Sequence, residues 1–450
     1  MADLVLDVRL DGFDGPAGQL VRHDSGALSF SYSATHLATA NPSPLSLSLP
    51  LSDEPFGDVP SRAFFNNLLQ ERDDALASLM AREGLSRDDT AGLLLHLGKD
   101  CAGALSVLPH GAPPAKVPGD LEHDYVELSE DRLVAIVTAL HKRRRLPDGT
   151  QDPSPLAGVQ SKIALTLLPG RGLAEPRHGS GAPTTHILKV PGPEHTADAA
   201  LEALTLNFSR SASLETARAD VVSIGGIEAL LVERFDRTLD DTGRVIRLHQ
   251  EDFAQALGLP AELKYERYGK AGRKFDAHQI KILIDSTIEP AVSRNVFVEA
   301  TLFDLLTGNC DAHAKNHALM HLGGGRVRLA PRYDLLPTRL DPALTDLLPF
   351  NIGAATRLAG IRSEDFDAFL SILGFASAAG RRRVSADLSS TLARGLANRT
   401  AELEARSMKR YADLIAANMR QLLPVLGAQV PPAAQNRDAY VASGGGWDNS

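Results

Sequence analysis

The sequence feature that most constrains the fold is a change of hydrophobic period near residue 248. Before it, short apolar runs typical of strands occur at Ile163–Leu168, Thr185–Val190 and Ile227–Glu233, around a helical run near Asp198–Ser213. After it, apolar residues recur at helical spacing. The helices expected there are Asp252–Leu257, Ala277–Thr287, Arg294–Leu306, Glu364–Leu373 and Leu388–Leu423. We therefore predict a small mixed α/β layer followed by a helical half.

The first hundred residues form a separate mixed region. Leu4–Leu10, Ala27–Tyr32 and Gly103–Leu108 have the pattern of strands, and Phe64–Glu83 has helical spacing up to Gly84. The linker candidate HGAPPAKVPGD comes soon after the predicted strand Gly103–Leu108. The C-terminal segment of the chain is polar and rich in Gly and Pro, which is typical of disorder. The expected regions are 1–110, 120–238, 239–426 and a disordered tail at 427–450.

Composition excludes several classes of protein. Lys plus Arg number 47 and Asp plus Glu 56, and the resulting net charge of −9 argues against coating nucleic acid by charge alone. Two cysteines, Cys101 and Cys310, suggest no disulfide framework and fit a reducing cytosol. The start MADLVLDVRL is not a signal peptide, and no stretch approaches the roughly 18 apolar residues of a membrane span. We expect a cytoplasmic protein with no membrane contact.

The segment TGNCDAHAKN follows the apolar run Val296–Leu306 and gathers Asp311, His313, Lys315 and Asn316. An Asp and an Asn five residues apart also occur in the catalytic loop of protein kinases, where the Asp accepts the proton of the substrate hydroxyl and the Asn binds a metal ion. Lysine could neutralise phosphoryl charge there, and histidine could brace the loop. On spacing alone, an Asx-rich turn at a helix end fits as well.

A second acid, Asp334, lies eighteen residues after Asn316 in PRYDLLPT. The segments HALMHL and RVRLAP on either side of three glycines predict a hairpin, which would return the chain to the same site. Kinases position a second metal-binding Asp in this way. Mg²⁺ would offset the free-energy cost of placing the Asp334 carboxylate among the apolar neighbours Tyr333 and Leu335. The alternative is a turn aspartate before Pro337.

Two segments before residue 190 are candidates for phosphate binding. LAGVQSKIAL offers Gly158 and Lys162 before a strand but is not a Walker loop, and THILKVP places Lys189 on a strand. A strand lysine can reach nucleotide phosphates, with Glu202 on the next helix as an ion-pair partner. The alternatives are a simple turn for the first segment and a lysine that extends to solvent for the second.

The segment LLVERFDR ends a strand where the helical half begins. The C=O of residue i and the N–H of residue i+2 face the same edge of an extended chain, so Glu233 and Phe235 could meet the donor–acceptor edge of adenine. An edge strand with alternating charges is the alternative. The order of these segments, from phosphate loop to metal-binding acid, is that of kinases.

Six segments together resemble the HipA family of serine/threonine kinases, the toxin half of bacterial toxin–antitoxin pairs. SLSLPL and FFNNLL near the N-terminus are similar to the family as well, so the resemblance covers nearly the whole chain. The six segments are SPLAGVQSKIAL, THILKVP, LLVERFDR, LHQEDFAQALG, GNCDAHAKNHALM and LAPRYDLLPT.

The resemblance implies an α+β, two-lobed protein-kinase-like fold with a mixed α/β N-lobe, an extra N-terminal subdomain and an all-helical C-lobe. It implies ATP and Mg²⁺ as cofactors, Asp311 as the catalytic acid, and Asn316 and Asp334 as metal ligands. The residues implied at the nucleotide are Ala157, Gly158, Val159, Gln160, Ser161, Lys162, Lys189, Glu233, Arg234, Phe235, His313, Lys315, Asn316, Tyr333 and Asp334.

The resemblance also implies partners: a HipB-like helix-turn-helix antitoxin, operator DNA through that complex alone, and a protein substrate such as an aminoacyl-tRNA synthetase. One departure concerns the serine that family members autophosphorylate, because Pro155 stands at that position. Either Ser154, one residue earlier, is the autophosphorylation candidate, or this chain lacks that means of switching itself off. Arg381, Arg382 and Arg383 could contact DNA phosphate or simply begin a solvated helix. An antitoxin-bound corepressor with ATP as structural ligand is the alternative function, and a small-molecule or lipid kinase a third.

Overall fold

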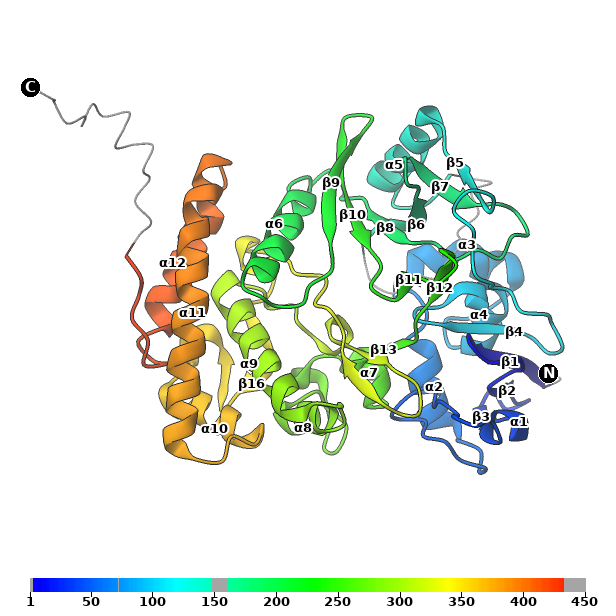
Figure 1. Ribbon diagram of the computed structural model, residues 1–450, viewed down its shortest axis with the longest axis horizontal. Helices are drawn as coiled ribbons and strands as arrows, with labels where there is room; N and C mark the ends of the chain where they lie inside the picture. Colours follow the sequence, from blue (N-terminus) through cyan, green and yellow to red (C-terminus); the bar gives the residue numbers. More distant parts are fainter. Residues whose placement is uncertain (1–2, 72, 148–159, 171, 433–450) are drawn as a thin grey trace, which may run out of the picture.

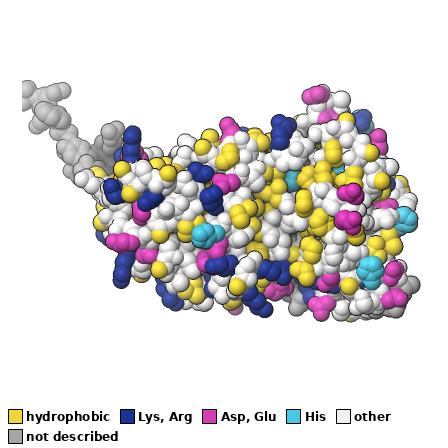
Figure 2. All heavy atoms as spheres, turned by 90° about the horizontal axis from the view of Figure 1, so that it is seen from below, with side chains coloured by type: hydrophobic (Ala, Val, Ile, Leu, Met, Phe, Trp, Pro, Cys, Tyr) yellow, Lys and Arg dark blue, Asp and Glu magenta, His cyan; other side chains and the backbone are white. Residues whose placement is uncertain are grey.

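The computed structural model describes residues 3–71, 73–147, 160–170 and 172–432. The molecule is elongated, with the region before residue 110 at one end, the long C-terminal helices at the other, and a sheet layer between them (Figure 1). Within these residues, no helix is both long and apolar enough to cross a membrane. Basic and acidic side chains are mixed over the face seen in Figure 2.

The N-terminal subdomain is an antiparallel sheet of four strands in the order β3-β2-β1-β4, packed against short helices. The apolar residues predicted to alternate do point inward, and Phe30, Phe64 and Phe65 are fully buried. Its elements are β1 Leu4–Leu10, β2 Gly18–Arg22, β3 Leu28–Tyr32, β4 Leu105–Pro109, α1 Ala34–Leu37, α2 Asp58–Asn66, α3 Asp73–Glu83 and α4 Thr90–Leu97.

The single helix predicted over Phe64–Glu83 is wrong, because the chain forms two helices, α2 and α3. The first ends at Asn67, whose side-chain Nδ2 donates to the carbonyls of Ala63, at 2.7 Å, and Leu259, at 2.8 Å. This bond to the helical half fixes the end of α2, and no local periodicity contains it.

The middle layer is a six-stranded antiparallel sheet in the order β5-β7-β6-β8-β10-β9. Helix α5 packs on one face, where Leu188 and Leu231 are buried, and α6 packs on the other, against Leu230 and Val232. The two faces explain why the core strands are apolar at consecutive positions. The elements are β5 Tyr125–Glu127, β6 Lys162–Leu167, β7 Leu173–Pro176, β8 His186–Lys189, β9 Ala219–Ile224, β10 Ile227–Glu233, α5 Glu130–Arg143 and α6 Asp198–Ser211.

The remainder of the chain is mainly helical, as predicted, around the long buried helix α9. Its helices are α7 Phe253–Ala256, α8 Ala277–Asp285, α9 Pro290–Thr307, α10 Ser363–Ile372, α11 Ala378–Ala405 and α12 Lys409–Leu422. The predicted run Leu388–Leu423 is divided into α11 and α12, with Ser407 between them in the left-handed region at φ 61°.

Small sheets add to the helical lobe, which is therefore not all-helical. The predicted hairpin is present as β14 and β15 and pairs with β13, and two further pairs of short strands occur. The strands are β11 Arg237–Leu239, β12 Val245–Arg247, β13 Gln250–Asp252, β14 Ala318–His321, β15 Val327–Leu329, β16 Leu347–Ile352 and β17 Ala355–Arg357.

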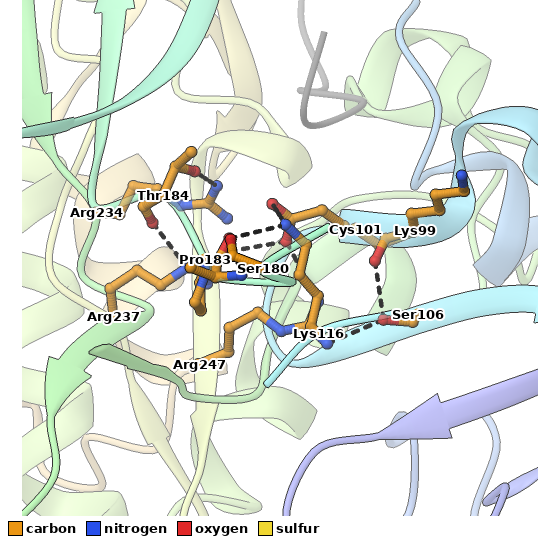
Figure 3. Close-up of polar contacts among 12 residues, drawn as sticks. Lys99, Cys101, Ser106, Lys116, Ser180, Pro183, Thr184, Arg234, Arg237 and Arg247 are labelled. Carbon is orange, nitrogen blue, oxygen red and sulfur yellow. Dashed lines mark hydrogen bonds and ion pairs between the residues drawn. The ribbon is translucent and has the colours of Figure 1, made fainter. Parts of the chain in front are cut away.

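A cluster of buried charges joins the N-terminal subdomain to the rest of the molecule (Figure 3). The carboxylate of Asp100 accepts contacts from Lys116 at 3.2 Å, Arg237 at 3.4 Å and Arg247 at 3.3 Å. These side chains are at most 9% exposed. We refer to Asp100, Lys116, Arg234, Asp236, Arg237 and Arg247 as the Asp100 cluster.

The segment SLSLPL forms a second joint. Ser46 donates its hydroxyl to the buried carboxylate of Glu251, and the Leu47 N–H donates to the same carboxylate at 3.0 Å. The Ser48 hydroxyl donates to the Gln255 carbonyl at 2.6 Å. The subdomain thus contacts the strand and helix that precede the proposed catalytic loop.

Candidate active site

Lys189 on β8 lies between two carboxylates from different parts of the chain. Its Nζ is 2.7 Å from Oε1 of Glu202 on α6 and 2.6 Å from Oδ1 of Asp334. The predicted ion pair with Glu202 is therefore present. Glu202 is 3% exposed and Asp334 is 38% exposed, so the site is closed on the helix side and open on the other.

A second lysine lies directly across the sheet. Strands β6 and β8 pair with Lys162 opposite Lys189, so both side chains are on the same face. Like charges opposite each other destabilise a sheet, and burial together with the neighbouring Lys189 lowers the pKa of Lys162 to about 8. An anionic group at this face would reverse that cost. We refer to Lys162, Lys189, Glu202 and Asp334 as the lysine site.

Asp334 reaches the lysine site because of the β14–β15 hairpin. It has φ 58°, an uncommon left-handed conformation for a residue other than glycine. Burial raises the pKa of Asp334, but the ammonium of Lys189 outweighs it and holds the pKa at about 2, so the carboxylate is ionised at neutral pH. A strained backbone that directs a charged group inward is typical of functional positions.

The loop after α9 presents Asp311. The helix ends at Gly308, which has φ 80°, and Oδ1 of Asn309 accepts from the Asp311 N–H at 2.9 Å. The Asp311 carbonyl accepts from the His313 N–H at 2.7 Å and from Nδ2 of Asn316 at 2.8 Å. The acid and the amide of the predicted motif are therefore held together. Burial raises the pKa of the Asp311 carboxyl.

Arg332 connects the loop and the hairpin. Its Nη2 donates to Oδ1 of Asp304 on α9 at 2.6 Å, and Asp304 in turn accepts from Nδ2 of Asn309 at 3.1 Å. The two chain segments that carry Asp311 and Asp334 are thereby fixed to the same helix turn.

Two residues of the motif point elsewhere. Nζ of Lys315 donates to the main-chain carbonyl of Asn67 at 3.1 Å and to its side-chain oxygen at 2.9 Å, so this ammonium contacts the N-terminal subdomain and not the lysine site. His313 is buried with its ring edge-to-face on Tyr265 at 4.9 Å. Burial lowers the pKa of His313 to about 3, so its ring is neutral.

At the predicted hinge, an aromatic contact joins the sheet to the hairpin segment. The Phe235 and Tyr333 rings are 5.4 Å apart, and the Tyr333 hydroxyl donates to the Lys315 carbonyl at 2.7 Å. Arg234 is buried in the Asp100 cluster, where it bonds Asp236 at 3.0 Å. Glu233 is the last residue of β10 and its side chain is exposed.

Part of the predicted phosphate loop, Ala157, Gly158 and Val159, and the candidate serine Ser154 lie outside the described residues. Gln160 and Ser161 are described, and the Ser161 carbonyl accepts from the Val190 N–H at 2.8 Å, which continues the β6–β8 pairing.

Arg381 and Arg383, near the start of α11, form ion pairs with acids of their own lobe. Arg381 is 2.8 Å from Asp367, and Arg383 is 3.4 Å from Asp387. Arg382 lies between them in the first turns of the helix.

Sequence analysis missed two features of the site. Tyr265 donates its hydroxyl to Oδ1 of Asp311, although a tyrosine in a loop 46 residues earlier gives no sequence signal. The opposition of Lys162 and Lys189 depends on strand register, which two separate apolar runs do not fix.

The sheet layer, the helical lobe and the site between them define a two-lobed, kinase-like fold. The sequence profile of the HipA-like C-terminal domain matches residues 154–417, and that of the HipA N-terminal domain matches residues 6–108. The chain belongs to the HipA family, which confirms the predicted family and fold class.

Individual relatives agree. The Y4mE protein of Sinorhizobium fredii is 35% identical over 410 residues, which is 91% of this chain and 93% of that protein. The serine/threonine-protein kinase toxin HipA of Shewanella oneidensis is 30% identical over 304 residues, or 65% of this chain and 66% of that protein. The chain is thus related to kinases that are toxins of toxin–antitoxin pairs.

A solved structure has the same fold over almost the whole chain. It is the complex of the Shewanella oneidensis MR-1 toxin–antitoxin system HipA, HipB and its operator DNA. A chain in it is 26% identical to this one with a TM-score of 0.74, and the match covers 94% of this chain and 96% of that one.

Proposed function

We propose that the protein is an Mg²⁺- and ATP-dependent serine/threonine protein kinase that acts as the toxin of a toxin–antitoxin pair. The observation that carries the proposal is the meeting of Lys189, Glu202 and Asp334 beside a loop that holds Asp311 and Asn316 together. Phosphoryl transfer needs cations at the phosphates, a positioned acid at the acceptor and oxygen ligands for a metal.

Nucleotide binding is assigned to the lysine site and the hinge. Lys162 and Lys189 place two ammonium groups on one face of the sheet, next to Glu202 and Asp334, and this concentration of cations supports phosphate binding there. Phe235, in contact with Tyr333, is suited to pack on an adenine ring at the end of β10.

The donor set fits Mg²⁺. The ion prefers oxygen ligands and is usually held by one or two carboxylates together with substrate phosphates. Asp334 supplies a carboxylate. The side-chain nitrogen of Asn316 donates to the Asp311 carbonyl, and this bond leaves the side-chain oxygen of Asn316 available to a metal ion. Across the described ranges, no three His, Cys, Asp or Glu side chains gather as a metal cage, so further ligands would have to come from the nucleotide. A bound Mg²⁺ would neutralise charge on the phosphates.

The acceptor side is assigned to Asp311. Its carboxylate would accept the proton of a serine or threonine hydroxyl as that oxygen attacks the terminal phosphorus of ATP. The loop bonds from Asn309 and to His313 fix the main chain on both sides of it. The Shewanella oneidensis relative is a serine/threonine-protein kinase, which supports a hydroxyl side chain as the acceptor.

The target and partner are further parts of the proposal. We assign the toxic effect to phosphorylation of a component of translation such as an aminoacyl-tRNA synthetase, in the cytoplasm. The HipB in the solved complex supports a HipB-like helix-turn-helix antitoxin, and the operator DNA there supports contact with DNA through that antitoxin.

The first test is intact-mass spectrometry of the purified chain with Mg²⁺ and ATP, beside the Asp311→Ala variant. We expect a gain of one phosphate in the wild type only, and peptide mapping then tests Ser154. If Asp311→Ala gains phosphate as fast as the wild type, the assignment of the base is wrong. If neither gains it, transfer to a purified synthetase decides between an active kinase and an ATP-binding scaffold.

The corepressor function is the second candidate, supported by the operator DNA in the related complex. Electrophoretic shift of operator DNA by the chain together with its antitoxin, and unchanged by Asp311→Ala, would establish it. The absence of a shift with the antitoxin present would exclude it.

A further inference from the structure

Tyr265 contacts the proposed base directly. It lies between two short 3-10 helices, Ala261–Leu263 and Glu266–Tyr268, and its hydroxyl donates to Oδ1 of Asp311. The other hydrogen bonds of Asp311 given above involve its main-chain atoms. Within the described part of the chain, Tyr265 therefore provides the side-chain hydrogen bond to this carboxylate.

The Tyr265 ring is fixed by its surroundings. The Arg267 guanidinium lies 3.8 Å from the ring centroid, and the His313 ring meets it edge-to-face at 4.9 Å. The neighbouring carbonyl of Lys264 accepts from the Ala314 N–H at 3.0 Å, which ties the segment to the catalytic loop itself. The hydroxyl is thus held at a defined position relative to Asp311.

The segment is also anchored on its far side. The Glu266 carboxylate accepts from the Asn351 N–H at 2.6 Å and from Nδ2 of Asn351 at 3.1 Å, on strand β16. A tyrosine that served only as packing would not require a hydrogen bond from its hydroxyl to an acid. Nor would it require hydrogen bonds that fix its segment on both sides. The geometry is that of a support for a functional side chain.

We propose that Tyr265 is a positioning residue that holds one oxygen of Asp311 so that the other stays available to the acceptor hydroxyl. The inference rests on the proposed function of Asp311. A carboxylate rotates about its last bond, and a hydrogen bond to one oxygen stops that rotation. A base must lie within hydrogen-bond reach of the proton it accepts, so fixing it raises the fraction of productive encounters.

The opposite reading is that the Tyr265 hydroxyl fills the place of the acceptor and blocks it. The two readings predict opposite changes when the hydroxyl is removed. Positioning predicts slower transfer in Tyr265→Phe, and blocking predicts faster transfer.

The test compares Tyr265→Phe with Tyr268→Phe, which removes a hydroxyl from the adjacent, exposed tyrosine. A coupled assay of ADP production from Mg²⁺-ATP reports transfer to any acceptor, water included. We expect kcat of Tyr265→Phe to fall about tenfold, the effect of losing one hydrogen bond to a charged group. The KM for ATP should match wild type, and the unfolding temperature should fall by only about a few degrees because one hydrogen bond is lost. Tyr268→Phe should match the wild type in every respect.

Unchanged or higher kcat in Tyr265→Phe would overturn the inference, and higher kcat would establish blocking. A loss of activity fully accounted for by the unfolded fraction at the assay temperature would reduce Tyr265 to a structural role. Asp311→Asn separates this from failure of the proposed function: if that variant turns over ATP like the wild type, Asp311 is not the base, whatever Tyr265 does.

Discussion

The Asp100 cluster and the lysine site are both clusters of buried charge, and their charges are arranged in different ways. In the Asp100 cluster, four cations surround the carboxylates of Asp100 and Asp236, and Asp100 itself contacts three of the cations. In the lysine site, two lysines of the same sign face each other across β6 and β8, and Asp334 is partly open. In the first, every cation lies within 3.4 Å of a carboxylate of the fold. In the second, two lysines share one face of the sheet, Lys189 contacts both carboxylates, and the partly exposed Asp334 leaves the site accessible to a ligand.

The arrangement of charges distinguishes a cluster that stabilises the fold from one that serves a ligand site. A buried ion network that satisfies itself holds parts of the fold in place and has no need of a ligand. A site with like charges opposed and an acid on a strained backbone is held by the surrounding structure for a purpose outside stability. The predictions below test this division.

The largest effect is expected for Lys189→Met. Transfer should fall about a hundred- to a thousandfold, because one fixed cation at the phosphates is removed. Stability should fall as well, because Asp334 and Glu202 lose the ammonium that lies 2.6 Å and 2.7 Å from them, although Glu202, whose pKa burial already raises, can take up a proton. ADP production and thermal unfolding measure the two quantities. Retained transfer would place the phosphates elsewhere.

Asp100→Ala should lower stability without lowering turnover. It leaves Lys116, Arg237 and Arg247 buried without their shared acid, which costs about 3 kcal/mol in the free energy of unfolding. The turnover of the folded fraction should be unchanged. Urea unfolding is the measurement.

The matched control is Asp367→Ala, which removes the acid of the Asp367–Arg381 pair at the surface. Such pairs contribute about 1 kcal/mol or less. Equal losses in the two variants would show that the Asp100 cluster is no more than another surface pair.

Acid should weaken the Asp100 cluster through Asp236. Burial raises the pKa of Asp236, but Arg234 and Arg237 outweigh it and hold the pKa at about 2. Because the unfolded value is about 3.9, the ionised group stabilises the fold above about pH 4, and this contribution is lost as the pH falls toward 2. The stability difference between wild type and Asp236→Asn in urea should shrink over that window. A difference that stays constant would contradict the assignment.

The smallest effect is expected for Lys162→Met. Removing one of two opposed lysines should raise the stability of the free protein by about 0.5 kcal/mol. The stabilisation by saturating Mg²⁺-ATP, about 2.7 kcal/mol at a hundred times Kd, should then be reduced. Thermal unfolding with and without nucleotide measures both. An unchanged nucleotide effect would exclude Lys162 from the phosphate site.

The sequence predicted those parts of the site that depend on local pattern. The strand that carries Lys189, the helix that carries Glu202 and the hairpin that returns Asp334 each follow from period and turn residues within a short segment. That Lys189, Glu202 and Asp334 would lie in one site was predicted from the order of their segments along the chain, which is the order found in kinases.

The parts that escaped prediction depend on contacts between distant segments. The break after α2 is set by a bond from Asn67 to Leu259, 192 residues away, and the direction of Lys315 by a bond to Asn67, 248 residues away. Apolar spacing continues across the break because both helices bury a face, so periodicity alone does not detect it.

The contact between Asn67 and Lys315 has a consequence for control of the protein. Asn67 is the C-cap of α2 in the N-terminal subdomain, and it accepts hydrogen bonds from the Lys315 ammonium. Lys315 belongs to the same short loop as Asp311. Any ligand that moves α2 also moves the acceptor of that ammonium. The position of the loop is therefore tied to that of the N-terminal subdomain by this hydrogen bond, and a fragment limited to the two lobes would lack it.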